Sequence, residues 1–143
     1  MSQSISARGP WRPTSVTFMA TSALGLFMLF LGVRGLVAPL VAAEGFGLPL
    51  VDGGDAVWLQ IKAGRDLCAG LSLVAFLALR NTRVMALFLL TSAAIPAIDM
   101  LVSLSAPVHD TVYALSVHGG AAALMLVIAV SLLAGAGTGS GRQ

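Results

Sequence analysis

The sequence predicts an all-α membrane protein, a bundle of four transmembrane helices with both ends in the cytoplasm. Of the 143 residues, 57% are hydrophobic and only 10% are charged, whereas a soluble domain carries about 25% charged residues. The mean hydropathy is +0.94. The apolar residues gather into four runs, each close to the roughly 20 residues that a helix needs to cross a bilayer, and short polar segments separate the runs.

These runs set the domain boundaries within a chain long enough for one compact unit. Residues 1–15 are expected to form a polar cytoplasmic tail, and residues 135–143 a flexible, Gly- and Ser-rich cytoplasmic tail. Residues 16–134 form the membrane domain. Its spans are expected at about residues 16–36, 57–79, 84–104 and 112–134.

The first run, from Val16 to about Leu36, predicts a retained helix. A cleaved signal peptide is the rival interpretation, because Val41-Ala42-Ala43 resembles a cleavage site. The run is longer than the apolar region of a signal peptide, which has about 7–15 residues. The following segment, Val41 to Ala56, contains four glycines and a proline and is expected to be a loop.

The second run carries charges at its beginning. Its uncharged part, Leu67 to Leu79, has only 13 residues, which is shorter than a span. The turns that carry Lys62, Arg65 and Asp66 are therefore expected to enter the membrane as continuous helix, because a helix satisfies its own backbone hydrogen bonds in lipid. A re-entrant segment is the alternative.

The third and fourth runs also contain polar residues. The third includes Pro96 and Asp99, and the fourth includes His118. Proline lacks an N–H, so Pro96 is expected to disturb its helix and to free a backbone carbonyl close to Asp99.

The basic residues outside the spans predict the orientation. Arg8 and Arg12 precede the first span, Arg80 and Arg83 join the second to the third, and Arg142 follows the fourth. The other two loops contain no lysine or arginine. By the positive-inside rule, both termini and the 80–83 turn are cytoplasmic. The short loops favour a bacterial inner membrane.

Composition also excludes several kinds of site. The net charge of +2 comes from eight basic residues that form no run, so nucleic-acid binding is not expected. Cys68 is the only cysteine, which excludes an intramolecular disulfide, and its apolar surroundings predict a packing role. His109 and His118 do not have the spacing of a metal site, and we expect neither a metal nor a bound cofactor.

Six ionisable residues fall inside the spans, all at a similar depth. With the predicted orientation they lie in the outer half of the bilayer, roughly 5–15 Å below its surface. A charge in hydrocarbon costs at least about 2.5–3.5 kcal/mol, so we expect these groups to face one another around a polar pocket. They are Arg34, Lys62, Arg65, Asp66, Asp99 and His118.

The basic members of this set are candidate ligand-binding residues. Arg34, Lys62 and Arg65 outnumber the two acids, which leaves a charge of +1 before His118 is counted. This excess suits an anionic or electron-rich group, such as a carboxylate, phosphate, carbonyl or quinone oxygen. Trp58 is a further candidate. However, Trp58 and Tyr113 each begin a span on the outer side, where interfacial anchoring is the ordinary role.

The acids and the histidine are candidate catalytic residues: Asp99, His118 and Asp66. Asp99 with His118 could act as a proton-transfer pair, because histidine titrates near neutral pH and a carboxylate can orient it. The alternative is a structural salt-bridge cluster in which the basic residues neutralise both acids.

Helical spacing predicts which neighbours accompany these residues. A stripe around the histidine would comprise Leu115, His118, Ala122 and Met125. Small residues beside the charged positions are expected to let helices approach closely. They are Gly32, Gly35, Gly64, Gly119 and Gly120.

Several stretches resemble a group of bacterial and fungal membrane proteins of undefined function with a DoxX-like, four-helix organisation. They are Gly32–Pro39, Gly45–Pro49, Lys62–Leu67, Ile95–Asp99 and His118-Gly119. Members of the wider group are linked with quinone, sulfur or oxidative-stress metabolism, and distant four-helix relatives include sterol-handling enzymes. The resemblance implies a pocket for a small apolar molecule with a polar head, although a fold does not fix an activity.

Three classes of function are consistent with this sequence. The first is a pocket protein for an amphipathic molecule, either a membrane-embedded isomerase, cyclase or hydratase or a redox accessory, and whether it is an enzyme stays open. The second is a structural or assembly subunit of a membrane complex. The third, a dimeric proton-coupled transporter, is least favoured because the cytoplasmic halves of the spans carry no ionisable residue. The expected partners are membrane lipid, an amphipathic ligand, and a homodimer or larger complex.

Overall fold

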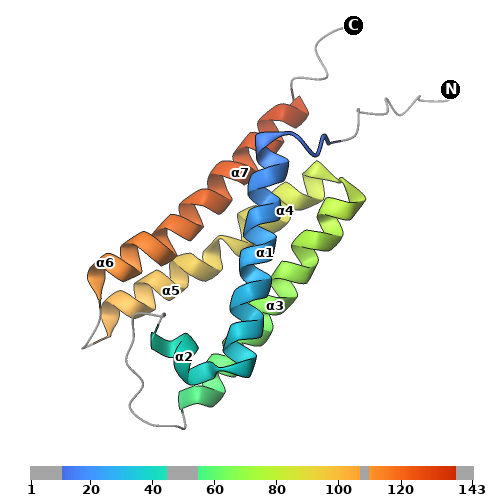
Figure 1. Cartoon of the computed structure of the whole chain (residues 1–143). Coiled ribbons are helices and arrows are strands. Elements are labelled where there is room, and N and C mark those ends of the chain that lie inside the picture. The colour runs from blue at the N-terminus through green and yellow to red at the C-terminus, as the bar shows by residue number, and fades with distance from the viewer. Residues whose placement is uncertain (1–10, 45–54, 107–109, 138–143) are drawn as a thin grey trace, which may run out of the picture.

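The computed structural model describes residues 11–44, 55–106 and 110–137, and every regular element in these ranges is helical (Figure 1). The bounds of the long helices lie close to the ranges expected from hydropathy. In chain order the elements are α1 (Val16–Val37), α2 (Pro39–Glu44), α3 (Asp55–Leu79), α4 (Thr82–Ser92), α5 (Ala94–Ser105), α6 (Thr111–Tyr113), the π-helical turn η1 (Ala114–Gly119) and α7 (Gly120–Gly137).

Within the described ranges, three helical stretches are long and apolar enough to cross a membrane. They are Val16–Val37, Thr82–Ser105 and Thr111–Gly135. Large apolar side chains are exposed around them, among them Leu26, Leu101 and Val127. Such a surface is unfavourable in water and suits contact with lipid. These helices indicate an integral membrane protein, in agreement with the composition.

The predicted loop after α1 begins with a helix instead. Ala38 interrupts the first helix with φ −138° and ψ 66°, because a residue before proline is disfavoured in the helical conformation. Pro39 then begins α2, where its missing N–H costs nothing. Residues 45–54 of that loop, with the Gly45–Pro49 motif and Asp52, lie outside the described residues, and its last two residues begin α3. Arg8, His109 and Arg142 also lie outside the described residues.

The third predicted span is divided at Ala93 into α4 and α5. Pro96 accounts for the division, because it has no N–H to donate to the carbonyl of Ser92, four residues earlier. The bond from the Ala97 N–H to the Ala93 carbonyl is 3.3 Å long, against 2.9 Å for the bond from Ala93 to Leu89. The disturbance expected from Pro96 is therefore present.

The fourth predicted span contains the π-helical turn η1, which the sequence analysis did not anticipate. A π turn holds one more residue than an α turn and so rotates what precedes it. Leu115 is consequently 51% exposed and does not belong to the stripe predicted around His118. Ala114 is buried in its place, together with His118, Ala122 and Met125.

The helices pack as two groups, which diverge toward the end that carries α2 and α6 (Figure 1). α1 lies along α3, α4 lies along α7, and α5 contacts η1. Glycine brings α1 and α3 together, because a Cβ added at Gly32 would lie 2.7 Å from the Leu67 nitrogen. Gly64 and Gly120 do not act as predicted, since a Cβ at either would meet nothing within 4 Å.

The apolar core lies toward the opposite end of the bundle, where α3 turns into α4. Trp11 belongs to this core although it precedes the first helix: its Nε1 donates to Thr17 Oγ1 over 3.1 Å, and its ring packs edge-on against Phe18. Trp11, which belongs to the expected N-terminal tail, is therefore packed in the core. The other core residues include Leu24, Leu73, Leu77, Met85, Leu89, Met125, Ile128 and Leu132.

Candidate functional site

A cavity of about 170 Å³ lies between the two groups of helices. Its lining comes from α1, α2, α3, α4, α5, α6, η1 and α7. All six ionisable residues that the sequence places inside the spans contribute to this lining. They are Arg34, Lys62, Arg65, Asp66, Asp99 and His118.

Lys62 is the centre of the acidic part of the cavity. Its Nζ donates to Asp66 Oδ2 over 2.7 Å, one turn further along α3. The same Nζ lies 4.0 Å from Asp99 Oδ2 on α5. All three side chains are largely shielded, with exposed fractions of 19%, 13% and 24%. Lys62 therefore pairs with carboxylates from two elements and links α3 to α5.

The two arginines have no carboxylate partner among the described residues. Arg34 Nη2 donates to the backbone carbonyl of Val41 over 2.8 Å and so connects α1 to α2. Arg65 makes no hydrogen bond or ion pair with any residue in the described ranges, and its side chain is exposed. Both arginines thus line the cavity, and neither pairs with a carboxylate in the described part of the chain.

His118 contributes to the cavity from the π turn. It is buried and packs edge-on against Tyr113, with 5.9 Å between the ring centroids. Within the described residues, the ion pairing of Asp99 is with Lys62. Asp99 and His118 line the same cavity without a direct hydrogen bond to each other. Proton transfer between them would therefore need a water molecule or a ligand group as a bridge.

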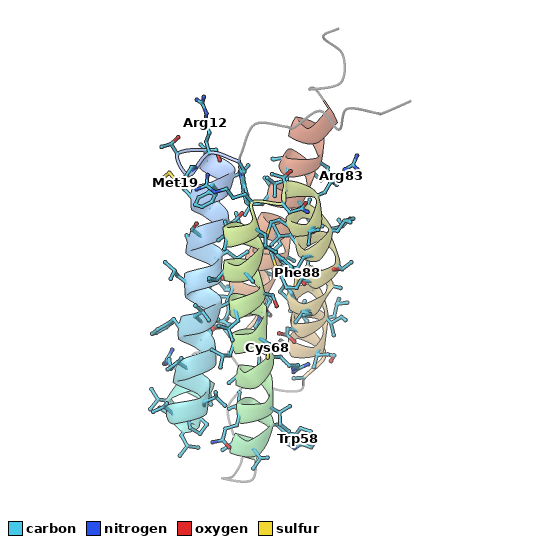
Figure 2. The ribbon with its side chains drawn as sticks, turned by 90° about the vertical axis from the view of Figure 1, so that its right-hand side faces the viewer. Arg12, Met19, Trp58, Cys68, Arg83 and Phe88 are labelled. Atoms are coloured by element: carbon cyan, nitrogen blue, oxygen red, sulfur yellow. The ribbon has the colours of Figure 1, made fainter. Side chains whose placement is uncertain are left out.

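The deeper part of the cavity is apolar. Leu24, Leu73 and Met125 line it and also belong to the core. Phe88, which Figure 2 places about midway along the bundle, lines it as well and packs against the core. The cavity therefore has charged groups toward one end of the bundle and a hydrocarbon floor toward the other.

Two residues lie elsewhere than the sequence analysis proposed. Trp58 is 71% exposed and does not line the cavity. It lies near the end of the bundle opposite Arg12 and Arg83 (Figure 2). This geometry gives no support to a ligand-binding role and fits the interfacial position instead. Cys68 is exposed on α3 rather than packed between helices.

Sequence reasoning also missed two contributors. Tyr113 lines the cavity, although its place at the start of a span predicts only anchoring. Its orientation depends on the π turn, which hydropathy does not reveal. Ala42 reaches the cavity from α2, a helix hidden in a glycine-rich segment. The Ala-Pro pair at Ala38 and Pro39 was the available signal for a new helix start.

Comparison with known proteins places the chain in a family without assigning an activity. The model of the family described as a domain of unknown function (DUF4267) matches residues 25–132. The match spans most of the chain, and it includes every ionisable residue that lines the cavity. No curated protein matches the sequence. No solved structure matches it either. The chain belongs to the DUF4267 family.

Proposed function

We propose that this DUF4267 protein binds an amphipathic small molecule, such as a quinone, an isoprenoid or a lipid-like compound, in the cavity between its helical groups. The observation that carries the proposal is the position of the six ionisable residues, which come from four separate elements and line one cavity. Pockets for small molecules are mostly apolar with a few convergent polar groups, and this cavity has that composition.

The proposal includes α3 as a fourth transmembrane helix. α3 has 25 residues, enough for about 37 Å of helix, and it lies along α1 (Figure 1). Because of its charged residues, α3 is not among the helices whose composition alone is apolar enough to cross a membrane. They become tolerable in a bilayer because Lys62, Arg65 and Asp66 line a cavity, where charged groups in membrane proteins are usually found.

The ends of the bundle support a topology with both termini in the cytoplasm. Arg12 and Arg83 lie at one end and Trp58 at the other (Figure 2). The Arg80 turn joins α3 to α4 at the arginine end. Basic residues favour the cytoplasmic side and tryptophan the interface, so the charged part of the cavity belongs to the outer half of the membrane. We propose a bacterial inner membrane as the location.

A relationship to DoxX-like four-helix proteins remains part of this proposal. The stretches that carry the resemblance and lie in the described ranges each supply residues to the cavity. Gly32–Pro39 supplies Arg34, Lys62–Leu67 supplies Arg65, and Ile95–Asp99 supplies Asp99. The resemblance therefore concentrates on the residues that we propose to bind the ligand.

If the protein is an enzyme, its chemistry would be proton transfer. Asp66, Asp99 and His118 are the side chains of the described lining that belong to the types used for general acid–base catalysis. Isomerisation, cyclisation or hydration of the ligand would use these groups directly. A redox role would require a diffusible electron carrier, because the described lining offers no redox-active side chain pair.

A second candidate is a structural or assembly role, which the ion pairs of Lys62 favour. The pair with Asp99 links α3 to α5, and such pairs can serve packing alone. Transport is disfavoured, because the floor of the cavity is continuous with the apolar core. The arginines argue for a ligand over pure structure, since Arg65 pairs with no carboxylate in the described residues.

Mass spectrometry of small molecules that copurify in mild detergent tests the proposal. Wild type would be compared with Asp99→Ala and Arg65→Ala, and with Arg83→Ala as a matched control outside the cavity. We expect one amphipathic species that is depleted in both cavity variants and retained in the control. An empty wild type, or bulk phospholipid unchanged by all the substitutions, would contradict ligand binding and favour the structural role.

A further inference from the structure

The charge distribution in the cavity indicates what kind of head group the ligand carries. Resting on the proposed function, we infer that the head group is an anion, a carboxylate or a phosphate, held by Arg34 and Arg65. Among the described residues, the fixed charges of the lining are three cations and two carboxylates. A monoanionic head group would bring the sum to zero, whereas a neutral quinone or isoprenoid head would leave it at +1.

Lys62 already pairs with the two acids, Asp66 and Asp99. Its Nζ lies 2.7 Å from Asp66 Oδ2 and 4.0 Å from Asp99 Oδ2. A lysine held between two carboxylates has little attraction left for a third anion, and the trio together carries a charge of −1. The positive charge available to a ligand therefore comes from the two arginines.

Both arginines have N–H donors that are available to a ligand. A guanidinium carries five N–H donors in a planar fork. One donor of Arg34 goes to the Val41 carbonyl, which leaves the others for a ligand, and Arg65 makes no hydrogen bond within the described ranges. The planar fork matches the two oxygens of a carboxylate or phosphate and forms paired, charge-assisted bonds with them. A single carbonyl oxygen accepts less well.

The apolar lining completes the recognition. From Arg34 to Leu24 the cavity follows about 15 Å of α1, and both residues belong to the lining. Leu73 and Phe88 continue the apolar wall from α3 and α4. An anion with a single hydrocarbon chain would place its head at the arginines and its chain against this wall.

Three probes that share one chain separate an anionic head group from a neutral one. They are laurate, dodecyl phosphate and dodecanol. Binding to the purified full-length protein would be measured in uncharged detergent by native mass spectrometry and by calorimetry. We expect laurate, dodecyl phosphate or both to bind at least about tenfold tighter than dodecanol, because charge-assisted hydrogen bonds are about twice as strong as neutral ones.

Substitutions then identify the binding groups. Arg34→Gln and Arg65→Gln should each weaken binding of the anion about tenfold or more and leave dodecanol binding unchanged. Arg83→Gln removes a positive charge outside the cavity. It should change neither the binding of the anion nor the binding of dodecanol. Arg65→Lys keeps the charge but loses the fork, so it should retain a reduced preference for the anion.

The outcomes distinguish this inference from the function on which it rests. Dodecanol that binds as tightly as both anions would overturn the anionic head group and leave the amphiphile pocket standing. No binding of any probe to folded wild type would count against both. Anion binding that survives Arg34→Gln and Arg65→Gln, but not Arg83→Gln, would place the anion site at the other end of the molecule. A preference for laurate or for dodecyl phosphate would identify which anion the site selects.

Discussion

Gly32 on α1 lies so close to Leu67 on α3 that a Cβ atom added to it would stand 2.7 Å from the Leu67 backbone nitrogen. The neighbouring atoms are backbone and cannot rotate away. Gly32→Ala should therefore push α1 and α3 apart and lower the free energy of unfolding by about 1–3 kcal/mol, the usual cost of overpacking. Thermal unfolding in detergent, followed by circular dichroism, measures the effect.

Gly64→Ala on α3 is the matched control, because a Cβ there meets nothing within 4 Å. Alanine also has the higher helix propensity, so this variant should be as stable as wild type or more so. Equal stability of the Gly32 and Gly64 variants would contradict the close α1–α3 crossing. Since Gly35 and Ala63 of the same crossing line the cavity, Gly32→Ala should weaken ligand binding too.

The pairs formed by Lys62 predict two unequal coupling energies. Double-mutant cycles with Lys62→Met would combine it with Asp66→Asn, at 2.7 Å, and with Asp99→Asn, at 4.0 Å. We expect about 1–3 kcal/mol of coupling for the first pair, because it is a largely shielded, charge-assisted hydrogen bond. The second should be under about 1 kcal/mol. The readout is the unfolding free energy, and a larger second coupling would contradict this geometry.

The π turn predicts that one residue can be removed without loss of the fold. Deleting the exposed Ser116 should convert η1 to α-helix, because a π turn contains one extra residue. The bundle from His118 onward would keep its register. Tyr113 should also keep its place beside His118, because the α turn that replaces the longer π turn rotates the chain by about the same angle.

Deletion of Val127, which is also exposed but lies in regular α7, is the control. It should rotate the buried residues Ile128 and Leu132 out of the core and strongly destabilise the protein. Unfolding temperatures of the two deletions give the comparison. If the Ser116 deletion unfolds as readily as the Val127 deletion, the extra residue is not accommodated by η1 alone.

Cysteine labelling tests whether α3 crosses the membrane. Thr14→Cys, Asn81→Cys and Thr111→Cys would each be placed in a Cys68→Ser background and treated with a charged maleimide in sealed vesicles. If α3 spans, residues 14 and 81 react from one side and residue 111 from the other. A re-entrant α3 would place residues 14 and 81 on opposite sides.

Wild type itself supplies the negative control for this experiment. Its single thiol, Cys68, is exposed on the surface of α3, which faces lipid in the proposed topology. A charged maleimide does not enter the hydrocarbon of a bilayer, because a charge there is costly. Cys68 should therefore remain unlabelled in vesicles and react after the protein is unfolded in detergent.

The long helices and the grouping of charges could be predicted from the sequence, because both follow from the cost of exposing polar groups to lipid. Hydropathy located the apolar spans near α1, α4 with α5, and α7. The same cost predicted that charges such as Arg34 and Asp99 would converge, and all six ionisable residues line one cavity.

Local backbone geometry was harder to predict. Pro96 signalled a disturbance but not that the helix would divide at Ala93. Hydropathy does not reveal the π turn, so Leu115 was wrongly placed in the stripe around His118, and Tyr113 was expected only to anchor the helix at the interface. Trp58 lies outside the cavity lining and is exposed, because a residue near the charged positions in sequence can still point outward from the bundle.

Trp11 has a consequence for the order in which the chain is assembled. Its backbone carbonyl accepts a hydrogen bond from Arg80 Nη1, 69 residues later, and its ring joins a core built from α1, α3, α4 and α7. During synthesis from the N-terminus, Trp11 emerges long before these partners exist. Trp11 can reach its final place only after α3, α4 and α7 have been made, so a residue that precedes these partners in the chain is among the last to dock.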